Sequence, residues 1–110
     1  MNKNNMNKNK IKQYRQGDVL MIEVNSIPEN VKPIKSRTLA LGEVTGHHHT
    51  FDNGATCFAD DEEASLGQYF ESSGATITHQ EHNPISVPSG KYRSIIQSEY
   101  SPEAIRNVAD

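Results

Sequence analysis

All five histidines of this 110-residue chain lie in two short clusters, and these clusters are the part of the sequence best suited to chemistry. Three are consecutive in GEVTGHHHTF, at positions 47–49, and the other two stand in THQEH, at 79 and 82. Imidazole has an unperturbed pKa near neutrality, so it can act as a general acid, a general base or a metal ligand. Three interpretations therefore compete: acid/base catalysis, a metal site, and surface histidines with no shared role.

Strand geometry decides which of these histidines can act together. Strand-forming residues flank the first cluster, and successive side chains of a strand point to opposite faces. His47 and His49 then share one face while His48 takes the other. His79 and Glu81 stand in the same relation in the second cluster. If the two strands are neighbours, one patch collects His47, His49, His79 and His82.

Two further segments carry groups that could bind a phosphate or a base. In GKYRSIIQSEY, alternation places Lys91 and Arg93 on one face and Tyr92 on the other. A functional interpretation sets the cations on a phosphate and uses tyrosines as flat surfaces for bases; the alternative is one solvated and one packed face. In YRQGD, Arg15 stands just before the first apolar run, and Gly17 permits close approach of the backbone.

The elements that must position these residues are short strands. Segments rich in strand formers occupy 19–22, 37–46, 55–60, 67–72, 75–80 and 85–100, and 47–52 continues the second of these after a kink at Gly46. Helical signals appear only in SPEAIRNV, where Ser101 can cap and Pro102 suits the first helical position. We predict an all-β fold, a small barrel or sandwich of about six or seven short strands with a short C-terminal helix.

Composition sets further limits. Residues 1–12 are Asn/Lys-rich and predict a disordered arm, so 13–110 form a single β-rich domain. Only 34% of the residues are hydrophobic and Trp is absent, so the core is modest and we expect a homodimer. No apolar run approaches the roughly 20 residues of a membrane helix, and we expect a cytoplasmic protein. Cys57, the single cysteine, predicts a buried small hydrophobe.

The formal charge of −3 conceals an asymmetry. Four of the eleven basic residues lie in the arm, which leaves 7 basic against 14 acidic residues, or −7, for positions 13–110. Binding of long nucleic acid depends on many clustered cations, so we do not expect it of this domain. A small anionic ligand in a local basic pocket is compatible with the charge.

Taken in order, YRQGDVL, LALGEVTGHHH, THQEH, SGKYR and QSEYSPEAIRNVAD resemble a family of small bacterial and phage proteins with the pattern YRQGDVL, GEVTGHxH, HEEH, G-x-Y and Q-x-EY. The resemblance spans 14–110. This group is similar to a ring nuclease family associated with type III CRISPR systems, small homodimeric β-rich proteins that open cyclic oligoadenylate second messengers. Phage copies would act as anti-CRISPRs.

The resemblance implies a set of site residues. The motif positions are Tyr14, Arg15, Gln16, Asp18, Glu43, Thr45, His47, His49, His79, Glu81, His82, Tyr92, Gln97 and Tyr100. We assign as catalytic His47, His49, His79, His82 and Arg15. We assign as substrate-binding Tyr14, Gln16, Asp18, Thr45, Glu81, Lys91, Tyr92, Arg93, Gln97 and Tyr100. Two positions depart from the pattern. Gln80 replaces a Glu, so a carboxylate at that position should not be essential, and His48 fills a free position, so it should be dispensable.

The chemistry of such a substrate requires no metal or other cofactor. Each 2′-hydroxyl of a cyclic oligoadenylate lies beside a phosphodiester, so the substrate supplies the nucleophile and the protein must orient it and move two protons. A cupin-like metal-binding module is the alternative, supported by H-x-H after a glycine and the later VPSG turn, but lacking the expected Glu. A third hypothesis is a non-enzymatic phage or defence protein that docks on a partner.

Overall fold

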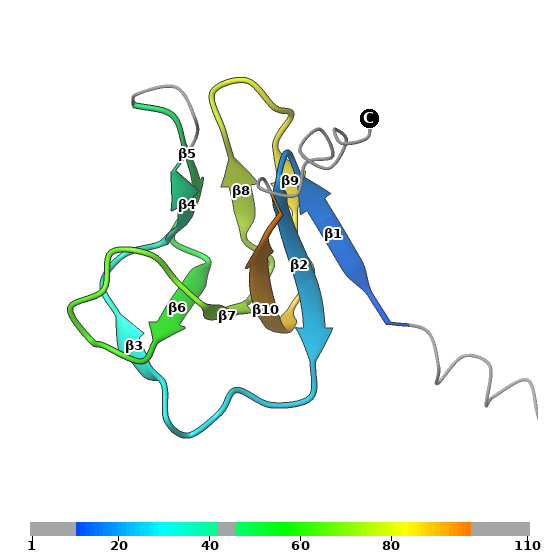
Figure 1. Cartoon of the computed structure of the whole chain (residues 1–110). Coiled ribbons are helices and arrows are strands. Elements are labelled where there is room, and N and C mark those ends of the chain that lie inside the picture. Colours follow the sequence, from blue (N-terminus) through cyan, green and yellow to red (C-terminus); the bar gives the residue numbers. More distant parts are fainter. Residues whose placement is uncertain (1–10, 42–45, 98–110) are drawn as a thin grey trace, which may run out of the picture.

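The computed structural model describes residues 11–41 and 46–97, and every regular element in these ranges is a β-strand (Figure 1). The first five strands are β1 (Gln13–Gln16), β2 (Val19–Val24), β3 (Lys32–Ile34), β4 (Thr38–Leu41) and β5 (His48–Phe51). The second five are β6 (Ala55–Ala59), β7 (Tyr69–Ser72), β8 (Thr76–Thr78), β9 (Ile85–Ser86) and β10 (Gly90–Ile96). The predicted all-β fold is therefore confirmed.

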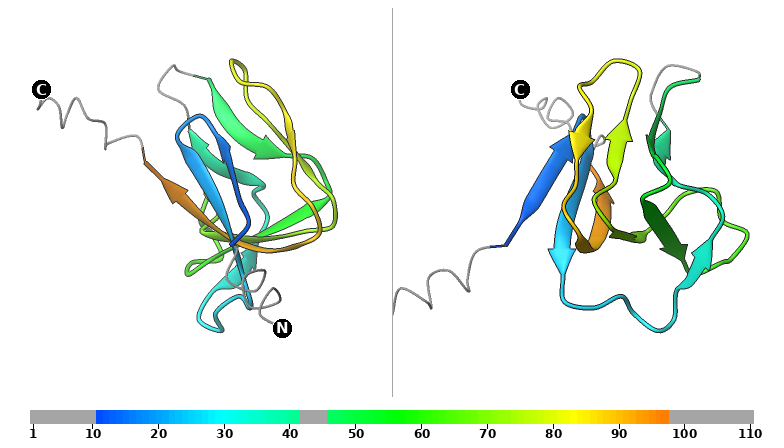
Figure 2. Two further views of the ribbon diagram at one scale, coloured as in Figure 1. Left: turned by 90° about the vertical axis from the view of Figure 1, so that its right-hand side faces the viewer. Right: turned by 180° about the vertical axis from the view of Figure 1, so that it is seen from behind.

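The strands form two antiparallel sheets that pack as a sandwich. The larger sheet has the order β1-β2-β10-β7-β6-β3 and the smaller one β4-β5-β8-β9. Seen from behind, β8 and β9 lie in front of β2 and β10, so the smaller sheet covers one face of the larger (Figure 2). The sheets stay open across the described residues, so the sandwich and not the barrel is the correct alternative.

The sequence underestimates the number of strands in two ways. Residues before the first apolar run form β1, because the two-residue turn at Gly17 and Asp18 folds them back on β2 in register Gln16↔Val19. Gly17 has φ +59°, the left-handed conformation that glycine supplies at the first position of a type II′ hairpin turn. Similarly, Lys32–Ile34 pairs with β6, which stabilises a strand in a segment that contains Pro33.

The predicted kink at Gly46 is also wrong. β5 does not continue β4 but pairs with it antiparallel, with Leu41 opposite His48, so the chain reverses between them. The 85–100 segment likewise divides into β9 and β10, which belong to different sheets. Short strands separated by glycine and proline admit several pairings, and tertiary packing selects among them.

The core lies between the sheets and is built around aromatic side chains. Phe70 packs against Phe51 at 4.6 Å and stacks on Tyr92 at 5.0 Å between ring centroids. Cys57 is fully buried, as predicted, and burial raises the pKa of its thiol to about 12. The core therefore joins β5 of the small sheet to β7 and β10 of the large one.

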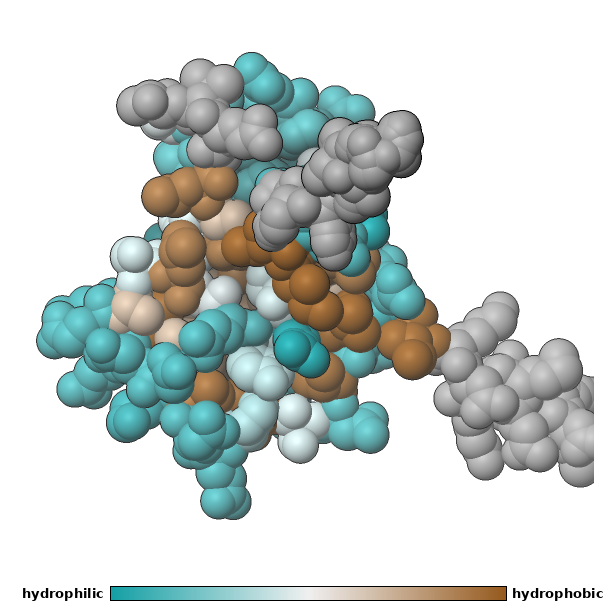
Figure 3. All heavy atoms as spheres, in the orientation of Figure 1, coloured by the Kyte–Doolittle hydropathy of each residue, from teal (hydrophilic) through white to brown (hydrophobic). Residues whose placement is uncertain are grey.

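The opposite face of the large sheet is only partly covered. Figure 3 shows apolar residues gathered over its middle, with hydrophilic residues around them. Strand register assigns Leu20, Ile22 and Ile95 to this outer face, together with Arg15 and Arg93. These side chains point away from the space between the sheets.

The predicted arm, at 1–12, and the predicted C-terminal helix lie largely or wholly outside the described residues. Within the described ranges, the structure has no helix long and apolar enough to cross a membrane.

Candidate functional site

Two of the predicted histidine partners meet because β5 pairs with β8. Thr50 lies opposite Thr78 and Phe51 opposite Ile77. Extending this antiparallel register by one residue beyond Thr50 and Thr78 places His49 beside His79, and their ring centroids are 4.2 Å apart. The expectation that the two histidine strands are neighbours is therefore confirmed.

The same register brings His47 beside Glu81. The Nδ1 atom of His47 lies 3.6 Å from a carboxylate oxygen of Glu81, and its ring centroid lies 5.6 Å from that of His79. A carboxylate at this distance stabilises a protonated imidazole. His47 thus has a carboxylate as its immediate partner in the site.

The fourth imidazole comes from the loop that joins β8 to β9. His82 lies 4.6 Å from His79 and 6.0 Å from His49, measured between ring centroids, and is nearly parallel to the His49 ring. The four imidazoles of His47, His49, His79 and His82 are hereafter called the histidine cluster. It lies at the end of the sandwich where the β8–β9 loop and the β1–β2 turn meet, uppermost in Figure 1.

The β1–β2 turn, which belongs to the larger sheet, packs against the cluster. A Cβ atom at Gly17 would lie 2.6 Å from Nε2 of His82 and 3.3 Å from Cε1 of His49. A larger residue there would displace the His82 ring, so the close backbone approach expected at Gly17 makes room for the histidines. Asp18, next in the turn, has a carboxylate oxygen 3.5 Å from Nε2 of His49.

His49 is the buried centre of the cluster. It is 1% exposed, and its Nδ1 atom lies 2.9 Å from Oε1 of Gln16, which is itself 2% exposed. Burial and then the charge of His79 lower the pKa of His49 to about 4, against a smaller opposing effect of Asp18. His49 is therefore neutral at pH 7 and can accept a proton.

His79 is half-buried and also held neutral. Its pKa is lowered by burial and then by the charges of His82 and His47. The backbone N–H of Glu81 donates to Nδ1 of His79 at 3.0 Å, which occupies the lone pair of the neutral ring. Two adjacent neutral imidazoles flanked by a carboxylate-paired one make an arrangement suited to moving protons.

His48 lies apart from the cluster, as alternation predicts. Its Nδ1 atom shares a hydrogen bond of 2.7 Å with the hydroxyl of Thr50, and its backbone N–H donates to the side-chain oxygen of Gln80 at 2.9 Å. Both residues that depart from the family pattern therefore help to hold β5 against the segment after β8.

The predicted phosphate-binding cations do not reach the cluster. Arg15 lies on the face of β1 opposite to Gln16, and it is paired with Leu20 in the register of the large sheet. Arg93 and Lys91 are exposed on the same outer face, opposite Ile22 and Val24. Among the described residues, the ion-pair partners of the cluster are the carboxylates of Glu81 and Asp18.

The predicted tyrosine surfaces belong to the core. Tyr92 is fully buried and its hydroxyl donates to the Pro88 carbonyl at 2.9 Å, so it cannot stack on a base. Burial raises the pKa of Tyr92 to about 12. Tyr14 packs edge-on against Tyr92 at 6.0 Å. Burial therefore contradicts the substrate-binding assignment of Tyr92, whereas that of the half-buried Tyr14 stays a prediction.

The remaining assigned residues divide between the turn and the undescribed ranges. The backbone N–H of Gln97 donates to the carbonyl of Asp18 at 2.9 Å, which places Gln97 against the β1–β2 turn. Thr45, Tyr100 and the motif position Glu43 lie outside the described residues.

The cupin-like alternative requires a metal site among the side chains of this domain. No group of three or more His, Cys, Asp or Glu side chains in the described ranges has a geometry that could hold a metal ion. The described side chains therefore do not fit the metal centre of the cupin-like alternative.

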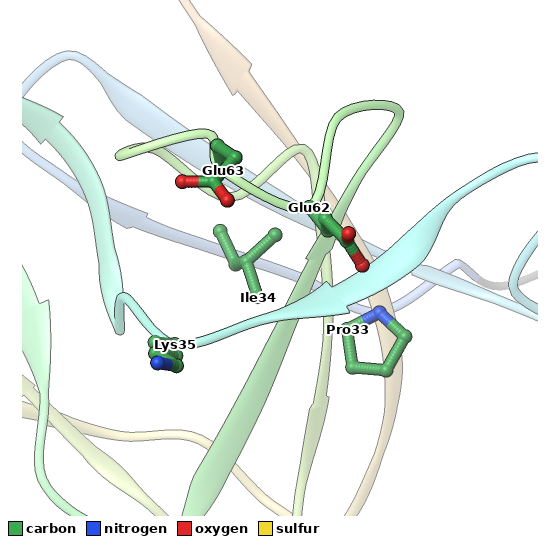
Figure 4. Close-up of a pocket in the computed structure, with 5 residues that line it drawn as sticks. All are labelled: Pro33, Ile34, Lys35, Glu62 and Glu63. Carbon is green, nitrogen blue, oxygen red and sulfur yellow. The ribbon is translucent and has the colours of Figure 1, made fainter.

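A hollow in the surface lies elsewhere, between β3 and the acidic loop (Figure 4). Its lining is Pro33, Ile34, Lys35, Glu62 and Glu63. It contains no residue of the predicted site. Both glutamates there are exposed.

Sequence reasoning did not identify the link between Gln16 and His49. Both are among the three buried polar residues of the described chain, and the hydroxyl of the third, Ser72, donates to the carbonyl of Val87 and accepts from the backbone N–H of Ala75. The available signal was a polar residue that alternates with the exposed Arg15 and thus points inwards.

Comparison with known proteins gives one finding. No curated protein and no solved structure matches the chain. A family model described as "Domain of unknown function (DUF8820)" matches residues 15–97. That match extends from β1 to the end of β10 and includes every residue of the histidine cluster. The chain therefore belongs to the family of domains of unknown function designated DUF8820.

Proposed function

We propose that this protein is a metal-independent phosphodiesterase that opens cyclic oligoadenylates. The observation that carries the proposal is the histidine cluster itself, four imidazoles gathered at one end of the sandwich with ring centroids 4.2–6.0 Å apart. Burial holds two of them neutral and a carboxylate lies beside a third. Neutral and protonated imidazoles side by side are what general base and general acid catalysis requires.

The reaction balances without a cofactor. The 2′-oxygen of one ribose attacks the adjacent phosphorus, its proton passes to a neutral imidazole, and the phosphorus–5′-oxygen bond breaks. A protonated imidazole gives its proton to the departing 5′-oxygen. The products are a linear oligoadenylate with a 2′,3′-cyclic phosphate at one end and a 5′-hydroxyl at the other, and the two imidazoles have exchanged protonation states.

His47 is the general acid in this proposal. A carboxylate oxygen of Glu81 lies 3.6 Å from its Nδ1 atom, whereas burial lowers the pKa of both His49 and His79. His82 is the exposed imidazole beside both neutral rings, and we assign it to the phosphate, in place of Arg15 and Lys91 on the outer face of the sheet. A positive group aimed at developing charge is an established source of rate acceleration.

The choice of substrate depends on the resemblance of the sequence motifs to the ring nuclease family. The proposal also includes a cytoplasmic location and a homodimeric state for this protein. A homodimer suits the substrate because a cyclic ligand is itself roughly symmetric and fits a two-fold site. A net charge of −7 over 13–110 opposes binding of long nucleic acid but leaves a compact cyclic oligonucleotide possible.

The test is to incubate purified protein with cyclic tri-, tetra- and hexa-adenylate, with and without EDTA, and to identify the products by mass. The proposal expects cleavage of at least one ring at the same rate in EDTA, with a 2′,3′-cyclic phosphate in the product. Cleavage that vanishes in EDTA and returns with a divalent ion would overturn the metal-independent mechanism. The absence of cleavage of all three rings would overturn the proposed activity.

A further inference from the structure

The hydrogen bonds around Gln16 fix the position of the proton on His49. The side-chain nitrogen of Gln16 lies 3.1 Å from the carbonyl oxygen of Ile77 and 2.9 Å from that of Asn83. Carbonyl oxygens only accept, so both N–H groups of the amide are committed to them. The side-chain oxygen of Gln16 must then face Nδ1 of His49, 2.9 Å away, and can only accept from it.

A neutral His49 consequently carries its proton on Nδ1 and its lone pair on Nε2. The Nε2 atom points towards the carboxylate of Asp18, 3.5 Å away, and lies on the side of the ring nearest the β1–β2 turn. When Nε2 takes up a proton, both nitrogens of the imidazolium have acceptors, Gln16 on one side and Asp18 on the other. The surroundings thus favour the neutral form of His49 before the reaction and offer a hydrogen-bond acceptor to each nitrogen of the imidazolium once it forms.

His79 is fixed in the opposite tautomer. The backbone N–H of Glu81 can only donate, so Nδ1 of His79 is the acceptor and the proton of the neutral ring is on Nε2. The two rings, tilted by 34° with their centroids 4.2 Å apart, therefore present unlike groups: a lone pair at Nε2 of His49 and an N–H at Nε2 of His79.

We propose that Gln16 is a positioning residue that holds His49 as the general base, while His79, in the opposite tautomer, donates a hydrogen bond to the phosphate oxygen of the substrate. This inference rests on the proposed function and assigns the roles within it. His49 is 1% exposed, so this step requires the exposed His82 beside it to turn aside from its ring; the Nε2 atom of His49 then takes the proton of the attacking 2′-hydroxyl. His79 stays neutral throughout and stabilises the negative charge that develops on phosphorus, as a neutral imidazole donor can.

The wild-type protein provides the first test, which needs no substrate. Long-range ¹H–¹⁵N correlation spectra of the imidazole rings, assigned with single His→Gln variants, report which nitrogen of each ring carries the proton. At pH 7 we expect His49 protonated at Nδ1 and His79 protonated at Nε2. The reverse tautomer at His49, or a rapidly exchanging mixture of both, would overturn the role of Gln16.

The second test removes the amide. Gln16→Met keeps the length of the side chain but cannot accept from Nδ1, and we expect a mixture of His49 tautomers and a loss of about 10- to 100-fold in kcat. Gln68→Met is the matched control, because the Gln68 oxygen accepts from the backbone of Asp60, away from the cluster. It should leave both the spectra and kcat unchanged.

Gln16→Glu completes the design, since a carboxylate can still accept from Nδ1 of His49. We expect it to restore the Nδ1-protonated tautomer and to move the acidic limb of the pH profile of kcat/KM to higher pH, because the added negative charge stabilises the imidazolium. A merely structural role of Gln16 predicts instead equal activity losses in both Gln16 variants with no movement of the acidic limb, and that outcome would overturn the inference. Wild-type protein with the expected tautomers but no cleavage of any cyclic oligoadenylate would overturn the proposed function. The hydrogen bonds of Gln16 and the tautomers of His49 and His79 would still be as inferred.

Discussion

Gly17 is the position where one added carbon atom tests the packing of the histidine cluster. In Gly17→Ala the new Cβ would lie 2.6 Å from Nε2 of His82 and 2.9 Å from its Cδ2 atom. His82 is an exposed side chain on a loop, so it can rotate away, whereas the buried His49, 3.3 Å from the same point, cannot. We therefore expect His82 to leave the cluster while the sandwich stays folded.

The cost in stability comes mainly from the backbone. Gly17 has φ +59°, a left-handed conformation that costs an L-residue about 1–2 kcal/mol. For a domain of this size, that corresponds to a fall of about 5–15 °C in Tm. Displacement of an imidazole by more than an ångström should lower kcat/KM by about 10²-fold if the cluster carries the chemistry.

Gly74→Ala supplies the matched control. Gly74 has φ +102°, so alanine is strained there too, but a Cβ would meet nothing within 4 Å. Thermal unfolding should therefore show losses of stability in both variants, while only Gly17→Ala shifts the imidazole signals of His82 in NMR spectra and loses activity. Unchanged His82 signals in Gly17→Ala, or equal losses of activity in both variants, would refute the reasoning.

Three further predictions concern the charge state of His49, the packing of Tyr92 and the outer face. Burial and the charge of His79 lower the pKa of His49 from 6.5 to about 4, so the unfolded chain binds this proton more readily than the folded one. The contribution of neutral His49 to the free energy of unfolding is therefore fully present above pH 6.5. It falls by up to about 3 kcal/mol as the pH drops towards 4. Denaturant unfolding at pH 7 and pH 5 should show a smaller loss for His49→Gln than for the wild type, and equal losses would contradict the assignment. Tyr92→Phe removes the hydrogen bond to Pro88 and should lower the free energy of unfolding by about 1 kcal/mol with unchanged cleavage, so a loss of activity at constant stability would restore Tyr92 to the substrate site. Arg15→Ala and Arg93→Ala should each keep kcat/KM within about threefold of wild type, and a loss of about tenfold or more would show that the outer face takes part.

The sequence predicts those features of the fold that depend on local pattern. Alternation in GHHHTF separates His48 from His47 and His49, because the period of a strand is two and needs no tertiary information. The all-β class follows in the same way from short segments of strand formers bounded by glycine and proline. Pairing of the two histidine strands was a condition of the predicted patch, and the β5–β8 register fulfils it.

What the sequence could not predict is which surfaces face each other. Arg15 and Gln16 are adjacent, and only the pairing of β1 with β2 turns Gln16 towards His49 and Arg15 towards the outer face. Lys91 and Arg93 share a face, as predicted, but the packing of the sheets decides that this face is the one away from the cluster. Tyr92 likewise has a side chain that could stack on a base, and only the packing of the sheets shows that it is buried in the core. Such choices depend on contacts between residues distant in the chain.

The measurement that tests the central claim most directly is cleavage of cyclic oligoadenylate in EDTA by wild type, His49→Gln and His48→Gln, with folding of each variant checked by circular dichroism. The two substitutions are the same chemical change on adjacent residues, one inside the cluster and one bonded to Thr50 outside it. We predict a loss of about 10²- to 10⁴-fold in His49→Gln and wild-type rates in His48→Gln. Equal rates in the two variants, whether both reduced or both unchanged, would contradict the claim that the histidine cluster carries the reaction.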